Sequence, residues 1–363
     1  MNCKHCILIV MLAFAGCREA ATNRNQIAGA PVEVEITPSA DTLVLSDLFA
    51  KSRYVEMKGL LLGYVAAVKQ TGDTLVVQSK VDNRDLHLFD KEGNYLRSVL
   101  HYGRAANEVI DLYAFCCNRS GGTIDVLCNY GTEIKRYPLD GKTQPQTVSL
   151  PRESVVAVND MAPVGDSTYA LYKDAGYLDS MEYKVYLYDI RKNAVTKAFL
   201  PLDKAAAEKI SIGQSVNFFR LDGKLCFYET FQDGICEITE EGLRPAVAFR
   251  RNAYTVPLEE LERCNDAMEF IQFCMESPYV WAHIDCRPCG DRIFSRFTYD
   301  REIYCNVIDL VSREAHSYLY IRDDLHSGET YPADQFYLVG NEDDMLICKA
   351  ATDEGNGLLL LWN

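Results

Sequence analysis

The feature that most constrains the fold is a run of four short strands between residues 61 and 112. The strands are predicted at Tyr64–Val68, Thr74–Gln78, Leu86–Asp90 and Tyr95–Leu100. Turns and polar loops rich in glycine, aspartate and asparagine separate them, since glycine tolerates the positive φ that a tight turn requires. Four consecutive strands of this length form an antiparallel meander, and in a repeating chain this meander is typical of a β-propeller blade.

The same order of strands and turns recurs five more times along the chain. The further copies cover residues 112–150, 157–202, 217–251, 278–324 and 331–363. The last copy has three strands, and an unassigned strand, Arg53–Met57, precedes the first copy. We therefore predict an all-β protein, a six-bladed β-propeller with four-stranded blades, whose ring is closed by this N-terminal strand because closure removes exposed sheet edges. An open β-sandwich array with the same turn spacing is the alternative.

Two stretches interrupt the repeats and carry helical patterns. Asp203–Ile210 predicts a short helix and Pro257–Ser277 a longer one, with a proline suited to the first helical turn. The apolar residues of the longer stretch recur at helical spacing, at Leu258, Leu261, Met268, Ile271 and Met275. This stripe predicts packing against the rim of the propeller, and a lid over the central opening is the second interpretation.

Residues 1–17 carry the pattern of an export signal. A short basic stretch precedes the apolar run Ile7–Ala15, which is too short to span a bilayer. The run leads into a Phe-Ala-Gly-Cys sequence that resembles a bacterial lipobox, with Cys17 as the lipidated residue; an ordinary secretory signal cut nearby is the alternative. We expect residues 18–46 to be a tether and lead-in, residues 47–363 to be the propeller, and the protein to be anchored by lipid to a membrane of the cell envelope, on its periplasmic or its surface side.

The chain is acidic, with a formal net charge of −15 over 363 residues. Because an anionic surface repels phosphate backbones, we expect no nucleic-acid partner. Hydrophobic residues make up 48% of the chain, which is enough for a large buried core, and no region has the composition of a disordered segment. Solubility is the favoured explanation of the negative charge, ahead of a role in binding cations.

Cysteine is abundant, at 14 residues, and the three in residues 1–17 leave an odd number for the rest of the chain. A fully paired disulfide scaffold is therefore excluded. Most of the thiols are expected to be small core hydrophobes in strands, as at Cys128, Cys226, Cys305 and Cys348. Cys286 and Cys289 have the spacing of a metal clamp or a redox pair, but no second ligand pair lies nearby and the local pattern predicts a turn.

Three short segments carry a resemblance to a known family. They are Tyr54–Met57, Leu88–Gly93 with its Phe-Asp and glycine, and Gly103–Val109. With these segments and the lipobox, the chain resembles the six-bladed β-propeller lipoproteins of Bacteroidetes, often called TolB-like or NHL-like. The family's third segment is typically Gly-Arg-Gly-Pro-(Gly/Asn)-Glu-aromatic; this chain keeps its Gly, Arg, Asn and Glu but has two alanines for Gly-Pro and a valine for the aromatic residue. The resemblance implies the fold and the envelope location.

The candidate ligand site is the mouth of the central channel. In a propeller, the loops between second and third strands and the connections between blades emerge on one face, where ligands usually bind. The candidate binding residues on these segments are Asp82, Arg84, Arg104, Asn107, Glu108, Tyr130, Tyr299 and Arg301. Arg104 offers a planar fork of donors and Glu108 accepts, although the two could instead pair with each other or cap their own loop.

Three functions remain open from the sequence. The favoured one is a non-enzymatic envelope protein that binds a glycan, a peptide or a partner protein at the mouth, without a cofactor or metal. A metal-dependent hydrolase or lactonase would need carboxylates and an amide to converge on one cation, and the candidates are Glu56, Asn129, Asp174 and Asp233. The third is a scaffold that binds through the sides of the ring. The few scattered histidines do not form a persuasive Ser-His-Asp order.

Overall fold

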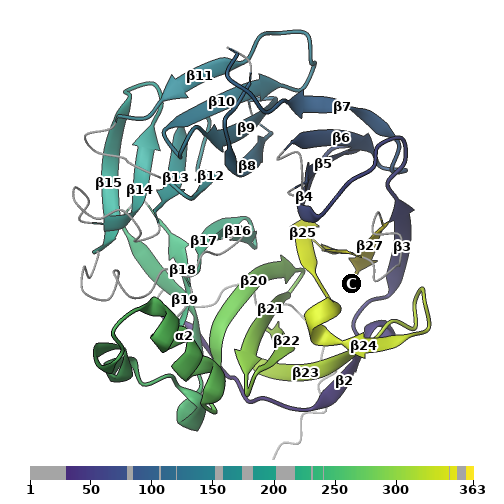
Figure 1. The fold of residues 1–363 in the computed structure, drawn as a ribbon, viewed down its shortest axis with the longest axis vertical. Helices are drawn as coiled ribbons and strands as arrows, with labels where there is room; N and C mark the ends of the chain where they lie inside the picture. The colour runs from purple at the N-terminus through teal and green to yellow at the C-terminus, as the bar shows by residue number, and fades with distance from the viewer. Residues whose placement is uncertain are drawn as a thin grey trace, which may run out of the picture. The chain divides into compact units, whose positions relative to one another are not determined.

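Six sheets, one for each repeat, form a ring in the computed structural model, seen along its axis in Figure 1. The structure describes residues 30–79, 85–105, 108–119, 121–151, 158–173, 183–201, 217–229, 232–239, 241–342, 344–349 and 357–363. Pro31–Asn363 forms one unit, and the predicted six-bladed propeller with four-stranded blades is confirmed there. In the described part of this unit, no helix is long and apolar enough to cross a membrane.

The first three blades follow one another in chain order, each an antiparallel meander. Blade 1 consists of β4 (Val65–Thr71), β5 (Thr74–Ser79), β6 (Leu86–Asp90) and β7 (Tyr95–Leu100). Blade 2 consists of β8 (Leu112–Asn118), β9 (Thr123–Cys128), β10 (Glu133–Pro138) and β11 (Gln146–Ser149). Blade 3 consists of β12 (Asp160–Pro163), β13 (Thr168–Tyr172), β14 (Tyr183–Asp189) and β15 (Ala194–Pro201). The first strand of each blade is the one nearest the ring's axis (Figure 1).

The last three blades all recruit strands from the N-terminal part of the chain. Blade 4 consists of β16 (Phe218–Leu221), β17 (Lys224–Phe227), β18 (Gly234–Ile238) and β19 (Leu243–Arg250). Blade 5 consists of β20 (Trp281–Cys289), β21 (Arg292–Tyr299), β22 (Glu302–Asp309) and β23 (Glu314–Arg322). Blade 6 consists of β25 (Leu338–Glu342), β26 (Met345–Lys349), β27 (Gly357–Trp362) and β3 (Lys51–Glu56).

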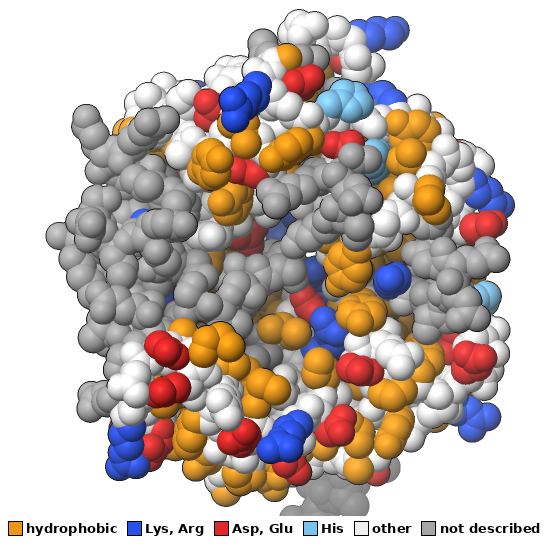
Figure 2. Space-filling model, in the orientation of Figure 1, with side chains coloured by type: hydrophobic (Ala, Val, Ile, Leu, Met, Phe, Trp, Pro, Cys, Tyr) orange, Lys and Arg blue, Asp and Glu red, His pale blue; other side chains and the backbone are white. Residues whose placement is uncertain are grey.

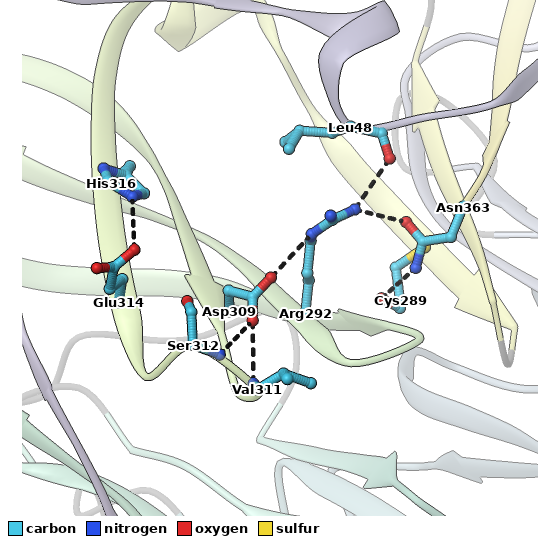
Figure 3. Close-up of polar contacts among 9 residues, drawn as sticks. All are labelled: Leu48, Cys289, Arg292, Asp309, Val311, Ser312, Glu314, His316 and Asn363. Carbon is cyan, nitrogen blue, oxygen red and sulfur yellow. Dashed lines mark hydrogen bonds and ion pairs between the residues drawn. The ribbon is translucent and has the colours of Figure 1, made fainter. Parts of the chain in front are cut away.

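The ring is closed by β3, as predicted from the strand left over before the first repeat. β3 pairs antiparallel with β27, with Tyr54 opposite Leu359. Arg292 of blade 5 holds both sides of this closure, since its guanidinium donates to the carbonyl oxygen of Leu48 at 3.0 Å and to Oδ1 of Asn363 at 3.1 Å (Figure 3). Leu48, three residues before the closing strand, and Asn363, just after β27, are therefore held by the same side chain.

Two further strands precede residue 47, in the segment that the sequence assigns to a lead-in. β1 (Val32–Glu35) runs parallel to β19 along the outer edge of blade 4, and β2 (Asp41–Val44) runs parallel to β23 of blade 5. A short strand, β24 (Thr330–Pro332), also pairs with β23. Val34 and Leu43 are buried and anchor the two N-terminal strands in the cores of these blades. The propeller unit therefore includes residues upstream of the predicted start.

An aspartate at the end of the third strand builds the turn to the fourth in several blades. In blade 1, the carboxylate of Asp90 accepts from the backbone N–H groups of Glu92 at 3.0 Å and Asn94 at 2.8 Å. Asp140, just past β10, and Asp189 and Asp309, which end β14 and β22, accept from backbone N–H groups two and three residues later. This local use of Asp side chains explains why turn patterns locate the repeats so well.

The cores lie between neighbouring blades, and the cysteines contribute to them. Cys128, Cys226, Cys305 and Cys348 are at most 1% exposed, as predicted for core thiols. Cys286 packs in the core between blades 4 and 5, and Cys289 packs between blades 5 and 6. The two thiols thus lie on opposite faces of one sheet and are not bonded to each other. Burial raises the pKa of both to about 12, which makes them unreactive.

The helical insertion before blade 5 is present, but it is broken and its buried face differs from the prediction. A 3-10 helix, η3 (Leu258–Arg263), precedes α2 (Ala267–Glu276), whose first turn is capped by the carboxylate of Asp266. Met268 is 71% exposed and Met275 41%, while Phe270 and Cys274 are buried against Val256 and Trp281. The break shifts the helical phase, so a single continuous stripe from Leu258 to Met275 was the wrong pattern. The second predicted helix, Asp203–Ile210, lies outside the described residues.

His87, in the third strand of blade 1, gives the fold a pH dependence. Its ring is 5% exposed, with Nδ1 3.0 Å from Oγ of Ser98, and burial lowers its pKa below the ordinary value of about 6.5. The unfolded chain then binds a proton that the folded chain resists, so the free energy of unfolding should fall as pH falls below about 6.5. We expect His87→Gln to reduce this slope between pH 7 and pH 5. Urea unfolding at both pH values measures the free energy of unfolding. An unchanged difference between the two pH values would show that other groups set the pH dependence of stability.

Candidate functional site

The predicted site lies on one side of the ring, which we call the loop face. It is the side where the loops between second and third strands and the connections between blades emerge. In the described residues it includes the connection 101–105 and 108–111 between blades 1 and 2, the loop 129–132 of blade 2 and the turn 300–301 of blade 5. Three of the predicted site residues, Asp82, Arg84 and Asn107, lie outside the described residues.

Glu108 is committed to its own loop. Its Oε2 accepts from the backbone N–H of Ala105 at 2.8 Å, and its carbonyl oxygen accepts from Nζ of Lys135 at 2.6 Å. The carboxylate also lies so close to Gly103 that a Cβ there would be 1.9 Å from Oε2. The glycine of this motif is therefore required by the close approach of the glutamate. Arg104, on the same loop, is exposed.

The loop of blade 2 is bound tightly to the connection between blades 1 and 2. Oδ1 of Asn129 accepts from the N–H of Ile110 at 3.0 Å, and the N–H of Tyr130 donates to the carboxylate of Asp111 at 2.9 Å. Asn129 and Tyr130 have φ angles of 54° and 60°, in the left-handed region that few residues other than glycine adopt. This backbone leaves the Tyr130 side chain 62% exposed.

Tyr299 and Arg301, the two predicted site residues of blade 5, differ in how far their side chains are exposed. The ring of Tyr299 packs edge-on against Tyr254, with centroids 5.5 Å apart, and against Tyr304 at 6.0 Å, so it is largely a packing residue. Arg301 is exposed in the tight turn to β22, and both it and Asp300 have positive φ. Among the predicted residues that the structure describes, Arg104, Tyr130 and Arg301 thus present side chains to solvent.

Tyr130, which the sequence predicted, belongs to a set of exposed tyrosines on the loop face whose other three members were not anticipated. Tyr64 is 40% exposed, Tyr102 54%, Tyr113 39% and Tyr130 62%, and we call these four residues the tyrosine face. Tyr64 immediately precedes β4, Tyr102 follows β7, Tyr113 is the second residue of β8 and Tyr130 follows β9, so all four lie at the loop-face ends of blades 1 and 2. Their positions at strand ends on the same side of the predicted blades were the signal that could have revealed them.

A second group joins aromatic rings and cations from blades 5, 6 and 1. Tyr64 meets Tyr337 edge to face, with centroids 6.3 Å apart, and Nζ of Lys349 lies over both rings. The guanidinium of Arg296 lies 5.1 Å from the centre of the Tyr337 ring and is paired with Asp285. Cation–π contacts of this kind fix the rings in place. Figure 2 shows hydrophobic and charged side chains side by side around the middle of the ring.

The residues proposed for a metal-dependent hydrolase are not brought together. Glu56 lies on β3, the outermost strand of blade 6, and pairs with Lys58 at 3.3 Å. Asp233 pairs with Arg251 at 2.7 Å in blade 4, and Asn129 holds the loop of blade 2. Asp174 lies outside the described residues. Within the parts of the chain that the structure describes, no three His, Cys, Asp or Glu side chains form a group suited to a metal ion.

Comparisons with known proteins agree on the fold. A protein of Bacteroides fragilis described as exported matches with a TM-score of 0.70 at 14% identity, over 92% of this chain and 99% of that one. A member of the DUF4221 family from Bacteroides vulgatus matches with a TM-score of 0.56 at 10% identity, over 87% of this chain and 96% of that one. At these identities the likeness shows the fold alone. None of the curated proteins compared with the sequence matches it.

The sequence profile of one protein family covers most of the propeller. It is described as a domain of unknown function, DUF4934, and it matches residues 31–352. The match begins at the residue before β1, so the family includes the two strands that precede the predicted start of the ring. This chain therefore belongs to the DUF4934 family of six-bladed β-propellers.

Proposed function

We propose that this protein is a non-enzymatic, exported binding protein that holds a glycan, a peptide or a partner protein on its tyrosine face. The observation that carries the proposal is the gathering of four partly exposed tyrosines on one side of two adjacent blades. Tyrosine offers an apolar ring and a hydroxyl with few rotatable bonds, and it is therefore enriched where proteins bind other molecules.

Hydrogen bonds hold the backbone segments that carry Tyr102 and Tyr130, which favours binding. Tyr102 is bridged to Val109, and the connection that contains them is hydrogen-bonded to the loop of Tyr130 through Asn129 and Asp111. A surface held in place before the ligand arrives loses less conformational entropy on binding. Arg104 lies in the same connection and adds an exposed planar donor beside the rings.

The location proposed for this binding protein is the cell envelope. Residues 1–17 carry an export signal with Cys17 as the proposed lipid site, and the structural neighbour from Bacteroides fragilis is described as exported. Lipid anchoring at Cys17 would keep a ligand-binding ring at a membrane without a spanning helix.

The proposal can be tested with glycan and peptide arrays probed with the purified protein, followed by calorimetry on any ligand that binds. We expect the double variant Tyr102→Ser with Tyr130→Ser to weaken binding at least about tenfold, because aromatic anchors dominate binding energy. The matched control is Tyr320→Ser, which removes a tyrosine that is 41% exposed on the outer strand β23. Equal binding by the double variant would contradict the site, and catalytic turnover of the ligand would contradict the non-enzymatic function.

A further inference from the structure

Arg287 stands out among the interior charges of the ring. It lies on β20, the strand of blade 5 nearest the axis, and only 4% of its surface is exposed. Its Nε has no hydrogen-bond partner, and none of the residues that the structure describes forms a hydrogen bond or ion pair with its guanidinium. An arginine stays protonated in proteins, so this is a buried, uncompensated positive charge.

The other buried arginines of this part of the ring are paired. Arg296 donates to the carboxylate of Asp285, and Arg251 donates to Asp233 at 2.7 Å and to the carbonyl oxygen of Gln232 at 2.9 Å. A buried charge without a partner is costly, because neither water nor an opposite charge replaces its hydration. The Nε of Arg251 also lacks a partner, but its two terminal nitrogens are paired, whereas none of the residues that the structure describes is hydrogen-bonded to any nitrogen of the Arg287 guanidinium.

The charge of Arg287 lies among charged groups of the strands nearest the ring's axis. It interacts with Asp285 on its own strand and with Asp160 on β12 of blade 3. β12 and β20 are the innermost strands of blades 3 and 5, and blade 4 lies between these two blades in the ring. Burial is the main influence on Arg287, and it lowers the pKa of the guanidinium, as expected for a charge that lacks a partner.

Asp160 interacts with Arg287 only at a distance, because its carboxylate oxygens are hydrogen-bonded to backbone N–H groups and not to the guanidinium. Oδ1 accepts from the N–H of Met161 at 2.8 Å, and Oδ2 accepts from the N–H groups of Asn217 at 2.7 Å and Phe218 at 3.2 Å. These bonds tie blade 3 to blade 4. The acidic group nearest in sequence, Asp285, is paired with Arg296. Neither carboxylate is therefore available to Arg287 as a direct partner.

A second cation, Lys69, also interacts with Asp160. Nζ of Lys69 on β4 donates to the carbonyl oxygen of Phe115 at 2.6 Å. With Asp285 and Arg296 counted as a neutral pair, the described groups here are two cations, Lys69 and Arg287, and one carboxylate. Among these described groups the excess is one positive charge, although the chain as a whole carries −15. At physiological salt the distant acidic groups are screened beyond about 8 Å, so the local charges decide what binds.

We propose that the central channel binds an oxyanion, a carboxylate or phosphate group, through the unpaired guanidinium of Arg287. The planar fork of an arginine can donate two parallel hydrogen bonds to such a group, which is the strongest arrangement it has. This site is separate from the tyrosine face and does not depend on it. The ligand is a small anion, or the anionic group of a longer ligand that enters the channel.

The experiment is isothermal titration calorimetry of the purified full chain with sodium acetate and, separately, inorganic phosphate, at constant pH and ionic strength. We expect one of the two anions to bind with one site per chain, and the tighter one identifies the class. Arg287→Met, which keeps the length but not the charge, should weaken binding at least about tenfold. Arg322→Met is the matched control, since Arg322 is exposed on the outer strand β23, and its binding should equal that of the unmodified protein.

Two further variants keep the outcome decisive. If Arg287→Met does not fold by circular dichroism, Arg287→Lys carries the test, because lysine keeps the charge and loses the fork, and we expect it to bind the anion more weakly than arginine does. The tyrosine-face double variant should bind the anion as the unmodified protein does, which separates this proposal from the previous one. Binding of neither anion by the unmodified protein, or equal binding by the Arg287 variant that folds, would overturn the proposal.

Discussion

Val55→Asp is expected to abolish the stable ring. Val55 is 3% exposed on β3 and packs in the core between blades 6 and 1, opposite Leu358 of β27. An aspartate there would bring an unpaired carboxylate into an apolar core where the closing strand β3 meets the C-terminal strand β27. Leaving a buried charge uncompensated typically costs about 3–5 kcal/mol, a large part of the stability of an ordinary domain.

The matched control for this prediction lies on the same strand. Arg53→Asp introduces the same side chain at an exposed position of β3, where only a hydrogen bond from Arg53 to the carbonyl oxygen of Lys91 is lost. We expect that variant to stay within about 1 kcal/mol of the unmodified protein. Unfolding in guanidinium chloride, followed by circular dichroism, measures the free energy of unfolding of both variants. A Val55→Asp protein with an unchanged midpoint would show that the ring does not depend on its closing strand.

Cys17→Ser is expected to move the protein from the membrane fraction to the soluble fraction. The proposed anchor is the lipid on this thiol, and serine cannot be lipidated in the same way. Because stable anchoring depends on acyl chains, their loss should release essentially all of the protein. Metabolic labelling with a radioactive fatty acid, followed by fractionation, measures both the modification and the location.

Cys6→Ser is the matched control for the anchor, since Cys6 lies in the same N-terminal segment but ahead of the apolar run. The Cys6→Ser protein should incorporate the fatty acid and appear in the membrane fraction, as the unmodified protein does. If Cys17→Ser still incorporates the labelled fatty acid, the anchor lies elsewhere. If neither protein is labelled, the segment is an ordinary secretory signal.

The blades and their closure were predictable because they depend on local patterns. An aspartate at or just after the end of the third strand forms its turn with the next few backbone N–H groups, so it marks a blade wherever it occurs. The closing strand followed from counting strands in each copy. The parallel strands β1 and β2 escaped prediction, because each has only four residues and its partner lies about two hundred residues or more away.

The site was only partly predictable, since its residues meet across blades. Tyr64 and Tyr337 lie at opposite ends of the sequence and touch only when the ring closes. Whether Arg287 has a direct partner depends on the side chains that the neighbouring strands place beside it. The sequence of β20 taken by itself would suggest a partner, because an aspartate lies two residues away. The helical insertion is broken before Asp266, and the break changes which residues of α2 face the core. A helical periodicity that assumes one continuous helix could not reveal this change.

The three N-terminal strands also impose an order on biogenesis. β1, β2 and β3 leave the ribosome long before their partners β19, β23 and β27. The outermost strands of the sheets in blades 4 and 5 therefore wait for partners made much later, and blade 6 cannot be completed until almost the whole chain has been synthesised, whereas blades 1, 2 and 3 contain all of their strands in one continuous stretch. Pairing over such distances is intrinsically slow and exposes strand edges in the meantime. The segment from β1 to β3 must stay unpaired until these partners have been made, and it is the part of the chain that most needs a chaperone.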